Sequence, residues 1–296
     1  MKKVIFIVEY EAKQPLFLRT EGVYDVATRR VGDKEVPSII SRKMIRPLRD
    51  TLRTYARQTD DPWIKGCEFP TETMCCYCID CLMFGGTNAS AGTQKELTKG
   101  KKVKFNVGTL QLRSLVHPSD ALAVSSGEEA IESETHTGVK EGRHAEIGRA
   151  LFSPFQVSQG TRFIGTFMLD IVSSGVKKPG DLVNLFATIF MHTKRYGART
   201  AQEGLVEPKI LAVVDVPYEV VTSYDLYKTV INYKIEDWKP EVDEYLQELK
   251  KIVPELSDID YKILTETNLL ALLKEDRLLG ELRKALEKEG VRVEKA

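Results

Sequence analysis

Hydrophobic and polar positions along this chain predict a mixed α+β fold. Short apolar runs rich in β-branched and aromatic side chains, bounded by glycine and polar residues, are typical of strands that are covered on at least one face. Such runs occur at residues 3–10, 103–107, 160–170 and 209–216. We therefore expect four principal strands within residues 1–216.

Two stretches between these strands show the period of an amphipathic helix. From Ser41 to Arg57 an apolar stripe recurs every three or four residues, and Ser41 is a candidate N-cap. Pro47 removes one backbone hydrogen bond from this helix and favours a kink or a helix start near it. Residues 181–192 form the second predicted helix.

The resulting order is strand, helix, two strands, helix and strand, which is the βαββαβ order of ferredoxin-like and RNA-recognition-type (RRM-like) domains. We expect this core in residues 1–216, interrupted by a cysteine-rich insertion at 58–100 and by a polar, glycine-punctuated hairpin or loop at 115–155. Residues 217–296 are predicted to be mostly helical and to pack on a neighbouring copy or on another subunit.

Charge is balanced over the whole chain but not along it. Lys+Arg and Asp+Glu each number 43, and residues 217–296 hold 13 basic and 18 acidic side chains, leaving 30 and 25 in residues 1–216. A neutral total argues against a protein that coats nucleic acid with its whole surface. The sequence lacks a long apolar segment of the kind that spans a membrane or precedes secretion, so we expect a cytoplasmic protein without membrane partners.

The first predicted helix carries a row of arginines. Arg42, Arg46, Arg49 and Arg53 recur at helical steps, with Asp50 as the only acidic residue nearby. Such a row is often only a solvated face. Because few acidic neighbours are spaced to pair with it, the row also suits a phosphate backbone.

All five cysteines lie between residues 67 and 81, a crowding that favours metal ligation over disulfides in a reducing compartment. Cys78 and Cys81 have the spacing of a zinc knuckle, and Cys67 with Cys75 would complete a structural Zn²⁺ site. Cys76 or His117 could replace one of these four ligands. Small buried thiols, or a redox pair of Cys78 and Cys81, remain alternatives.

Several motifs together resemble the RAMP superfamily of CRISPR effector proteins, and in particular the Cas-seven-like backbone subunit of Cascade complexes. They are Cys78-x-x-Cys81-x-x-Phe84-Gly85, the helix motif Leu48-Arg49-Asp50-Thr51-Leu52-Arg53, Ala150-Leu151-Phe152 after the polar segment, and Gly160-Thr161-x-Phe163. Asp50 stands where the family often carries glycine. The cysteine-rich insertion and the Arg195–Thr200 loop are most similar to the type I-D branch.

The resemblance implies a subunit that forms a filament of several copies along a guide crRNA, with other Cascade subunits as partners and residues 115–155 as the thumb. Sequence is then read by base pairing to the guide, and the protein contacts single-stranded RNA through phosphates and riboses. Tyr196 would either stack on a base or pack under its loop, and Gly197 would allow close approach of RNA or form a turn. The expected RNA contacts are Arg42, Lys43, Arg46, Arg49, Arg53, Lys194, Arg195, Tyr196, Gly197, Arg199 and Thr200.

Two other functions fit parts of the sequence. Some relatives in the superfamily cut RNA with an aspartate in the loop before the first helix, where Asp33 lies here, so a guide-directed ribonuclease or single-strand nuclease is the alternative. An isolated loop aspartate is most often a turn former, and we favour a non-enzymatic subunit. A zinc-stabilised protein-interaction module without an RNA role is the third possibility.

Overall fold

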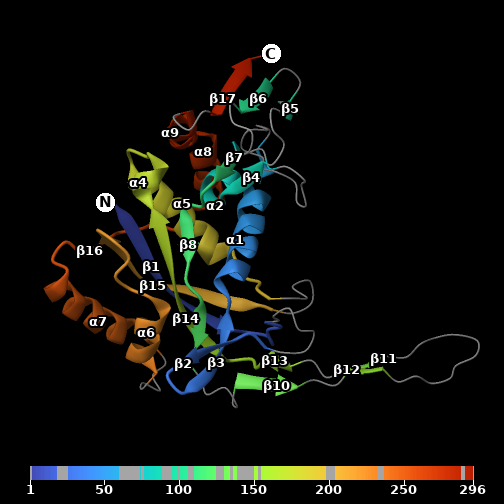
Figure 1. Cartoon of the computed structure of the whole chain (residues 1–296), viewed down its shortest axis with the longest axis vertical. Helices are drawn as coiled ribbons and strands as arrows, with labels where there is room; N and C mark the ends of the chain where they lie inside the picture. Colours follow the sequence, from blue (N-terminus) through green and yellow to red (C-terminus); the bar gives the residue numbers. More distant parts are fainter. Residues whose placement is uncertain are drawn as a thin grey trace, which may run out of the picture.

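A computed structural model describes residues 2–18, 26–59, 74, 77–88, 95–98, 101–105, 110–124, 130–133, 136–138, 150–152, 155–197, 204–231, 237–287 and 291–295. Its centre is an antiparallel sheet with the strand order β16-β15-β1-β14-β9-β3-β2, and β8 pairs beside β9 on β14 (Figure 1). The bounds of these strands are β1 Lys3–Ala12, β2 Thr28–Val31, β3 Lys34–Ile39, β8 Val116–Pro118, β9 Ala121–Ala123, β14 Arg162–Asp170, β15 Val206–Val216 and β16 Ser257–Asp258.

Helices cover both faces of this sheet. They are α1 Ser41–Ala56, α2 Ile79–Phe84, α4 Ile171–Ser174, α5 Pro179–His192, α6 Ser223–Val230, α7 Lys239–Ile252, α8 Glu266–Lys274 and α9 Asp276–Glu287. Successive side chains of strand β1 point to opposite faces of the sheet, and those on both faces are apolar. Each face therefore needs its own layer of helices. Phe6 and Tyr10 join the core under α1 and α5, whereas Ile5 and Ile7 join the core under α6 and α7.

The strand predicted at 103–107 lies outside the central sheet, which corrects the expected core. Strand β6 (Lys101–Phe105) instead pairs with β5 (Lys95–Thr98) and β17 (Val291–Lys295). The place beside β14 is taken by β8 and β9. Three lysines in β6 do not suit a strand covered on both faces, whereas the small residues of β9 do: a Cβ at Gly165 of β14 would already lie 3.0 Å from that of Ala121.

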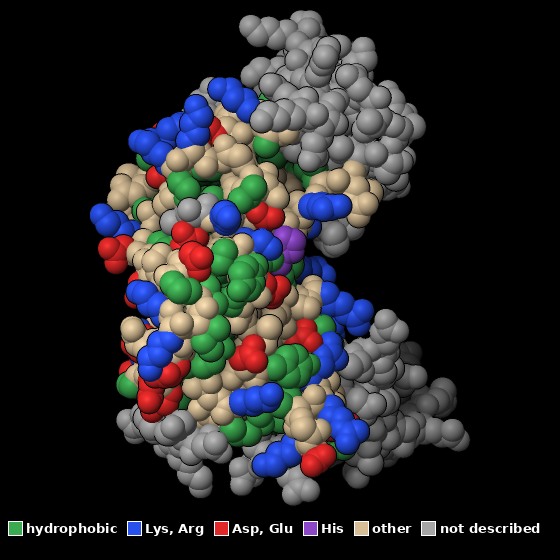
Figure 2. Space-filling view, turned by 60° about the vertical axis from the view of Figure 1, so that its left-hand side comes forward, with side chains coloured by type: hydrophobic (Ala, Val, Ile, Leu, Met, Phe, Trp, Pro, Cys, Tyr) green, Lys and Arg blue, Asp and Glu red, His purple; other side chains and the backbone are tan. Residues whose placement is uncertain are grey.

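The described helices of the C-terminal region pack their apolar faces on the chain's own core, and docking of this region on a neighbouring copy or another subunit stays a prediction. Trp238 and Leu246 belong to the core under α6 and α7, and Leu269 and Leu282 belong to the core under α1 and α5. On the side where α6 and α7 lie, Figure 2 shows acidic and basic side chains interspersed over the described surface. The acidic excess of this region is thus spread out on that face.

Two pairs of short strands between residues 131 and 157 form a ribbon that leads away from the sheet. The hairpin predicted at 115–155 therefore begins too early, because β8 and β9 belong to the central sheet. Strand β10 (Ile131–Ser133) pairs with β13 (Phe155–Val157), and β11 (His136–Gly138) pairs with β12 (Ala150–Phe152). Figure 1 shows β11 and β12 far from the central layers. A further pair, β4 (Gly86–Asn88) and β7 (Leu110–Leu112), lies next to α2. Among the described residues, no helix has the length and apolar character that a membrane span requires.

Helix α1 is capped from a distance and not by its own first residue. Ser41 is already helical, and the N-cap residue Ile40 offers no side-chain hydrogen bond. Asp120, in the turn between β8 and β9, accepts a hydrogen bond from the Ser41 amide at 2.6 Å and another from Arg29 of β2. Partial burial acts to raise the pKa of Asp120, but these hydrogen bonds outweigh it and hold the pKa below its ordinary value.

We predict that Asp120→Ala lowers the free energy of unfolding by about 1 kcal/mol, because the first turn of α1 loses its acceptor. In the parent protein this contribution is present at neutral pH and is lost as pH falls through the depressed folded-state pKa, below the ordinary value of 3.8. Urea unfolding at several pH values measures both effects. A difference between parent and variant that persists unchanged at pH 2 would contradict this account.

Candidate nucleic-acid interface

One face of α1 forms a wall of an open groove of about 720 Å³. The groove-lining residues of α1 recur at helical steps on the side that is not packed on the sheet. They are Lys43, Arg46, Pro47, Asp50, Thr51 and Thr54. The buried side of the same helix holds Met44, Leu48, Leu52 and Ala56. Pro47 lies within a continuous helix, so it neither starts nor ends α1.

The opposite wall is the end of α5 and the segment after it, with His192, Thr193, Lys194, Arg195 and Gly197. This segment is fixed by its own backbone, since Arg195 forms a bridge with Leu205 and the Val206 amide donates to the Lys194 carbonyl at 2.8 Å. Gly197 has a φ of +91°, and a Cβ there would lie 2.9 Å from the Phe17 carbonyl oxygen. Glycine is therefore required by the neighbouring main chain.

Hydrogen bonds hold the two walls together. The hydroxyl groups of Thr193 and Thr51 lie 2.9 Å apart, and the Tyr55 hydroxyl lies 2.8 Å from Nδ1 of His192. Partial burial, followed by the nearby charge of Lys194, lowers the pKa of His192, which favours the neutral imidazole. A neutral imidazole can accept at Nδ1, so Tyr55 can act as the donor.

Four cations line the groove against one carboxylate. Lys43 and Arg46 come from α1, and Lys194 and Arg195 come from the opposite wall. Partial burial, together with the charge of Arg42, lowers the pKa of Lys43. An anion in the groove would counter this repulsion between cations. The arrangement suits a chain of phosphates that passes between α1 and the segment after α5.

Arg49 and Arg53 do not belong to this groove, and the expectation that the arginine row is unpaired is wrong for both. Arg53 is 4% exposed, and both guanidinium groups bind the fully buried carboxylate of Asp80 in α2. Nε of Arg49 lies 2.8 Å from Oδ1, and Nη2 of Arg53 lies 2.6 Å from Oδ2. Helical spacing could not reveal this partner, because it lies on another element.

Some of the other predicted RNA contacts also lie away from the groove. Tyr196 is fully buried and packs edge-on against Tyr10 at 5.1 Å between ring centres, so in this structure it forms part of the core and is not a base-stacking platform. Arg42 is exposed but does not line the groove. Arg199 and Thr200 lie outside the described residues. Sequence reasoning did not identify His192, Thr51 and Thr193 as groove residues, because Thr51 occupies a variable position of the helix motif and the other two belong to no motif.

Cys78 and Cys81 are the two predicted metal ligands that the structure describes. Both side chains are buried, and their sulfur atoms and the Asp80 carboxylate lie within 4.8 Å of one another. The Asp80 oxygens already bind two guanidinium groups, so of these three side chains the two cysteines fit the sulfur ligation of zinc. Cys67, Cys75 and Cys76 lie outside the described residues. His117, the suggested substitute, is exposed on β8.

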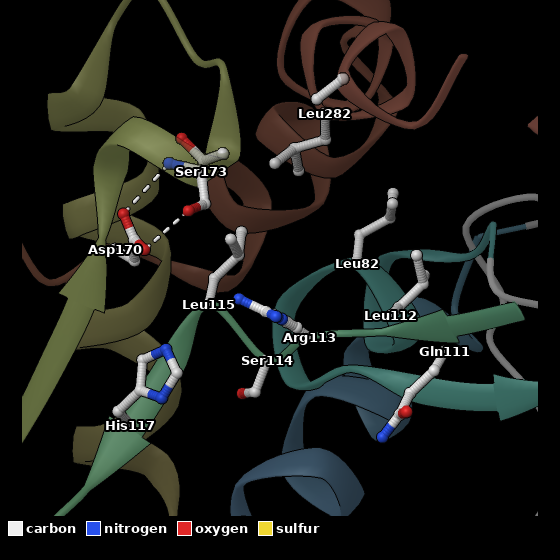
Figure 3. Close-up of a pocket in the computed structure, with 12 residues that line it drawn as sticks. Leu82, Gln111, Leu112, Arg113, Ser114, Leu115, His117, Asp170, Ser173 and Leu282 are labelled. Carbon is white, nitrogen blue, oxygen red and sulfur yellow. Dashed lines mark hydrogen bonds between the residues drawn. The ribbon is translucent and has the colours of Figure 1, made fainter. Parts of the chain in front are cut away.

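A second hollow, of about 430 Å³, lies between α2, β8, α4 and α9 (Figure 3). Its polar groups include Arg113 and His117, but the Asp170 carboxylate is turned to Ser173, whose amide and hydroxyl donate to it at 3.0 and 2.7 Å. The opposite signs of Arg113 and Asp170 give this hollow no single-sign field. It is therefore a weaker candidate for a polyanion than the groove beside α1.

We predict that Asp80→Ala lowers the free energy of unfolding by about 3–5 kcal/mol, because the buried guanidinium of Arg53 and the partly buried guanidinium of Arg49 lose their shared carboxylate. Denaturant unfolding of the purified protein measures the loss. Asp33→Ala is the matched control, since the Asp33 side chain at the tip of the β2–β3 hairpin is fully exposed, and it should change stability by less than about 0.5 kcal/mol. Equal effects of the two substitutions would contradict a buried ion cluster.

The chain was compared with known protein sequences, families and structures. No curated protein sequence matches the chain. The crystal structure of Thermofilum pendens Csc2 is similar, with a TM-score of 0.61 and 22% identity over 97% of this chain and 89% of that chain. Chains of two structures described as CRISPR RNA-guided surveillance complexes are also similar.

The first of these two has a TM-score of 0.50 at 14% identity and covers 96% of this chain and 99% of that chain. The second, described as pre-nicking, has a TM-score of 0.55 at 11% identity and covers 91% and 98%. At such identities the likeness concerns the fold. The sequence itself matches the family described as Csc2 Crispr over residues 1–290, and the chain therefore belongs to the Csc2 CRISPR family.

Proposed function

We propose that this protein is a backbone subunit of a CRISPR effector complex, that it holds a guide crRNA, and that the groove beside α1 is where the RNA backbone lies. The observation that carries this proposal is the meeting of Lys43 and Arg46 with Lys194 and Arg195 across one open groove. Contacts of this kind bind phosphates without reading bases, which suits a subunit whose guide differs from complex to complex.

The proposed core is RRM-like. Taken in chain order, β1, α1, the broken strand β8–β9, β14, α5 and β15 follow the βαββαβ order, and the sheet order β15-β1-β14-β9 is that of a ferredoxin-like domain. The type I-D branch is proposed on the sequence resemblance, and the family match is compatible with it. The cytoplasmic location is still a prediction.

In the proposed assembly, several copies follow one guide in a filament, with other Cascade subunits at its ends. The ribbon formed by β10–β13 and β11–β12 is the proposed thumb, because it projects from the core and could reach a neighbouring copy (Figure 1). The role is structural and not enzymatic. Asp33, the candidate for cleavage, lies in the turn of the β2–β3 hairpin, 4.0 Å from Arg30.

A structural Zn²⁺ is proposed at Cys78 and Cys81, with Cys67 and Cys75 as the other ligands. Its support is the pair of buried, closely spaced thiols at knuckle spacing. Asp80 lies between these cysteines and binds Arg49 and Arg53 of α1. A zinc ion there would stiffen α2 and hence the position of α1.

We predict that changing Lys43, Arg46 and Lys194 together to Ala weakens binding of single-stranded RNA at least about tenfold at low salt. The slope of log affinity against log salt should become shallower by about 2. Binding then makes fewer phosphate contacts and so releases fewer counterions from the RNA. Fluorescence anisotropy with unrelated RNA sequences at several salt concentrations measures both quantities. Arg49 and Arg53 are left intact, because their loss would unfold the site.

The matched control changes Lys228, Lys250 and Lys251 to Ala, which removes the same charge from exposed positions on α6 and α7. This variant should bind RNA with nearly the affinity of the parent. If both triple variants lost affinity equally, net charge and not the groove would account for binding.

We predict that the purified protein holds about one zinc ion per chain and that Cys78→Ser with Cys81→Ser loses most of it, because two of four thiolate ligands are removed. Elemental analysis of both proteins gives the metal content. The variant should also unfold at a lower denaturant concentration than the parent. An equal zinc content in the two proteins would refute ligation by these cysteines.

A further inference from the structure

One carboxylate lies among the cations of the groove. Asp50 shares the groove face of α1 with Lys43 and Arg46, and its side chain is 56% exposed. Asp50 forms loose ion pairs with Nε of Arg46 at 3.7 Å and with Nη1 of Arg53 at 3.8 Å, and both distances exceed those of hydrogen bonds. A negative charge at this place repels a phosphate. Its presence in an anion-binding groove needs a reason.

The hydroxyl and imidazole groups around Asp50 already have partners. The Thr54 hydroxyl donates to the Asp50 main-chain carbonyl at 2.9 Å, Thr51 is paired with Thr193, and His192 is paired with Tyr55. Among the described residues, none donates a hydrogen bond to the Asp50 carboxylate. Its oxygens are thus strong acceptors that face the groove without a donor from the protein.

We propose that Asp50 accepts a hydrogen bond from a ribose 2′-hydroxyl of the bound strand and so makes the groove select RNA over DNA. This inference rests on the proposed function of the groove as a nucleic-acid site. The 2′-hydroxyl is the donor that RNA has and DNA lacks. With DNA, the Asp50 carboxylate repels the phosphates and gains no hydrogen bond. With RNA, the 2′-hydroxyl donates a hydrogen bond to this charged acceptor and offsets the repulsion.

A simpler role for Asp50 is to orient Arg46 one turn away on the same helix. Through Arg46, that role would affect RNA and DNA to the same extent, because both carry the phosphates that Arg46 binds. The proposed role affects their ratio. The two roles are therefore separated by the sugar of the probe.

The experiment compares RNA, DNA and 2′-fluoro-RNA of one unstructured sequence, each bound to the full chain and followed by fluorescence anisotropy at one salt concentration. The 2′-fluoro probe keeps the ribose conformation of RNA but has no hydroxyl donor. The parent protein should bind RNA about tenfold more tightly than either other probe, as expected for one hydrogen bond to a charged acceptor.

Asp50→Ala should weaken RNA binding and strengthen DNA binding, so that their affinity ratio falls from about 10 to below about 2. Asp50→Asn keeps one acceptor oxygen and should retain more of the ratio than Asp50→Ala. The matched control is Asp33→Ala, which removes the same charge at a fully exposed hairpin tip and should leave the ratio unchanged.

The inference is overturned if Asp50→Ala changes RNA and DNA affinities by the same factor in either direction, or if the parent binds RNA and 2′-fluoro-RNA equally. In both cases salt-dependent RNA binding through Lys43 and Arg46 would stand, so the groove would keep its proposed function. A parent that binds none of the three probes would overturn the proposed function and this inference together.

Discussion

The interaction on which the rest of the structure depends is the buried bond network of Asp80 with Arg49 and Arg53. The buried Arg53 and the partly buried Arg49 are stabilised because one fully buried carboxylate accepts from both. The Gly85 carbonyl takes a further hydrogen bond from Arg49 at 2.9 Å. The network joins α1 to α2 and fixes the rotation of α1 about its axis. That rotation decides which basic side chains reach the groove.

The same network explains how far the sequence could predict the site. The helical period located α1 and the side chains Lys43 and Arg46, but it could not separate these from Arg49 and Arg53. The partner of Arg49 and Arg53 is Asp80, which lies 31 and 27 residues away from them in the sequence. It is the single aspartate of a short helix and belongs to no charge pattern. Likewise, the bond between Thr193 and Thr51 spans 142 residues and joins two residue types that are common on any surface.

The secondary-structure elements also differ in how well the sequence predicts them. Strands β1, β14 and β15 and helices α1 and α5 are long and strongly patterned, and their predicted positions agree with the structure to within a few residues. Strands β8 and β9 have three residues each, too few for a period to be seen. The apolar pattern favours residues 103–107 for this place, a stretch that overlaps β6 and has the valine and phenylalanine content of a strand, but β6 is too rich in lysine for the centre of a sheet.

The C-terminal region shows why local acidity is a poor guide to what a segment contacts. Several of its described acidic side chains, such as Glu244, Glu248 and Glu266, are exposed on helices whose apolar faces pack on the core. One link from this region to the sheet involves a cation. Arg162 of β14 lies 3.8 Å from the centre of the Trp238 ring and donates to Glu9 of β1 at 2.5 Å. Helices α6 and α7 bury the sheet face opposite α1 and α5, whereas α8 and α9 pack beside α1 and α5, and no described residue of the C-terminal region lines the basic groove. Both walls of the groove thus come from residues 1–216, the part of the chain with the basic excess.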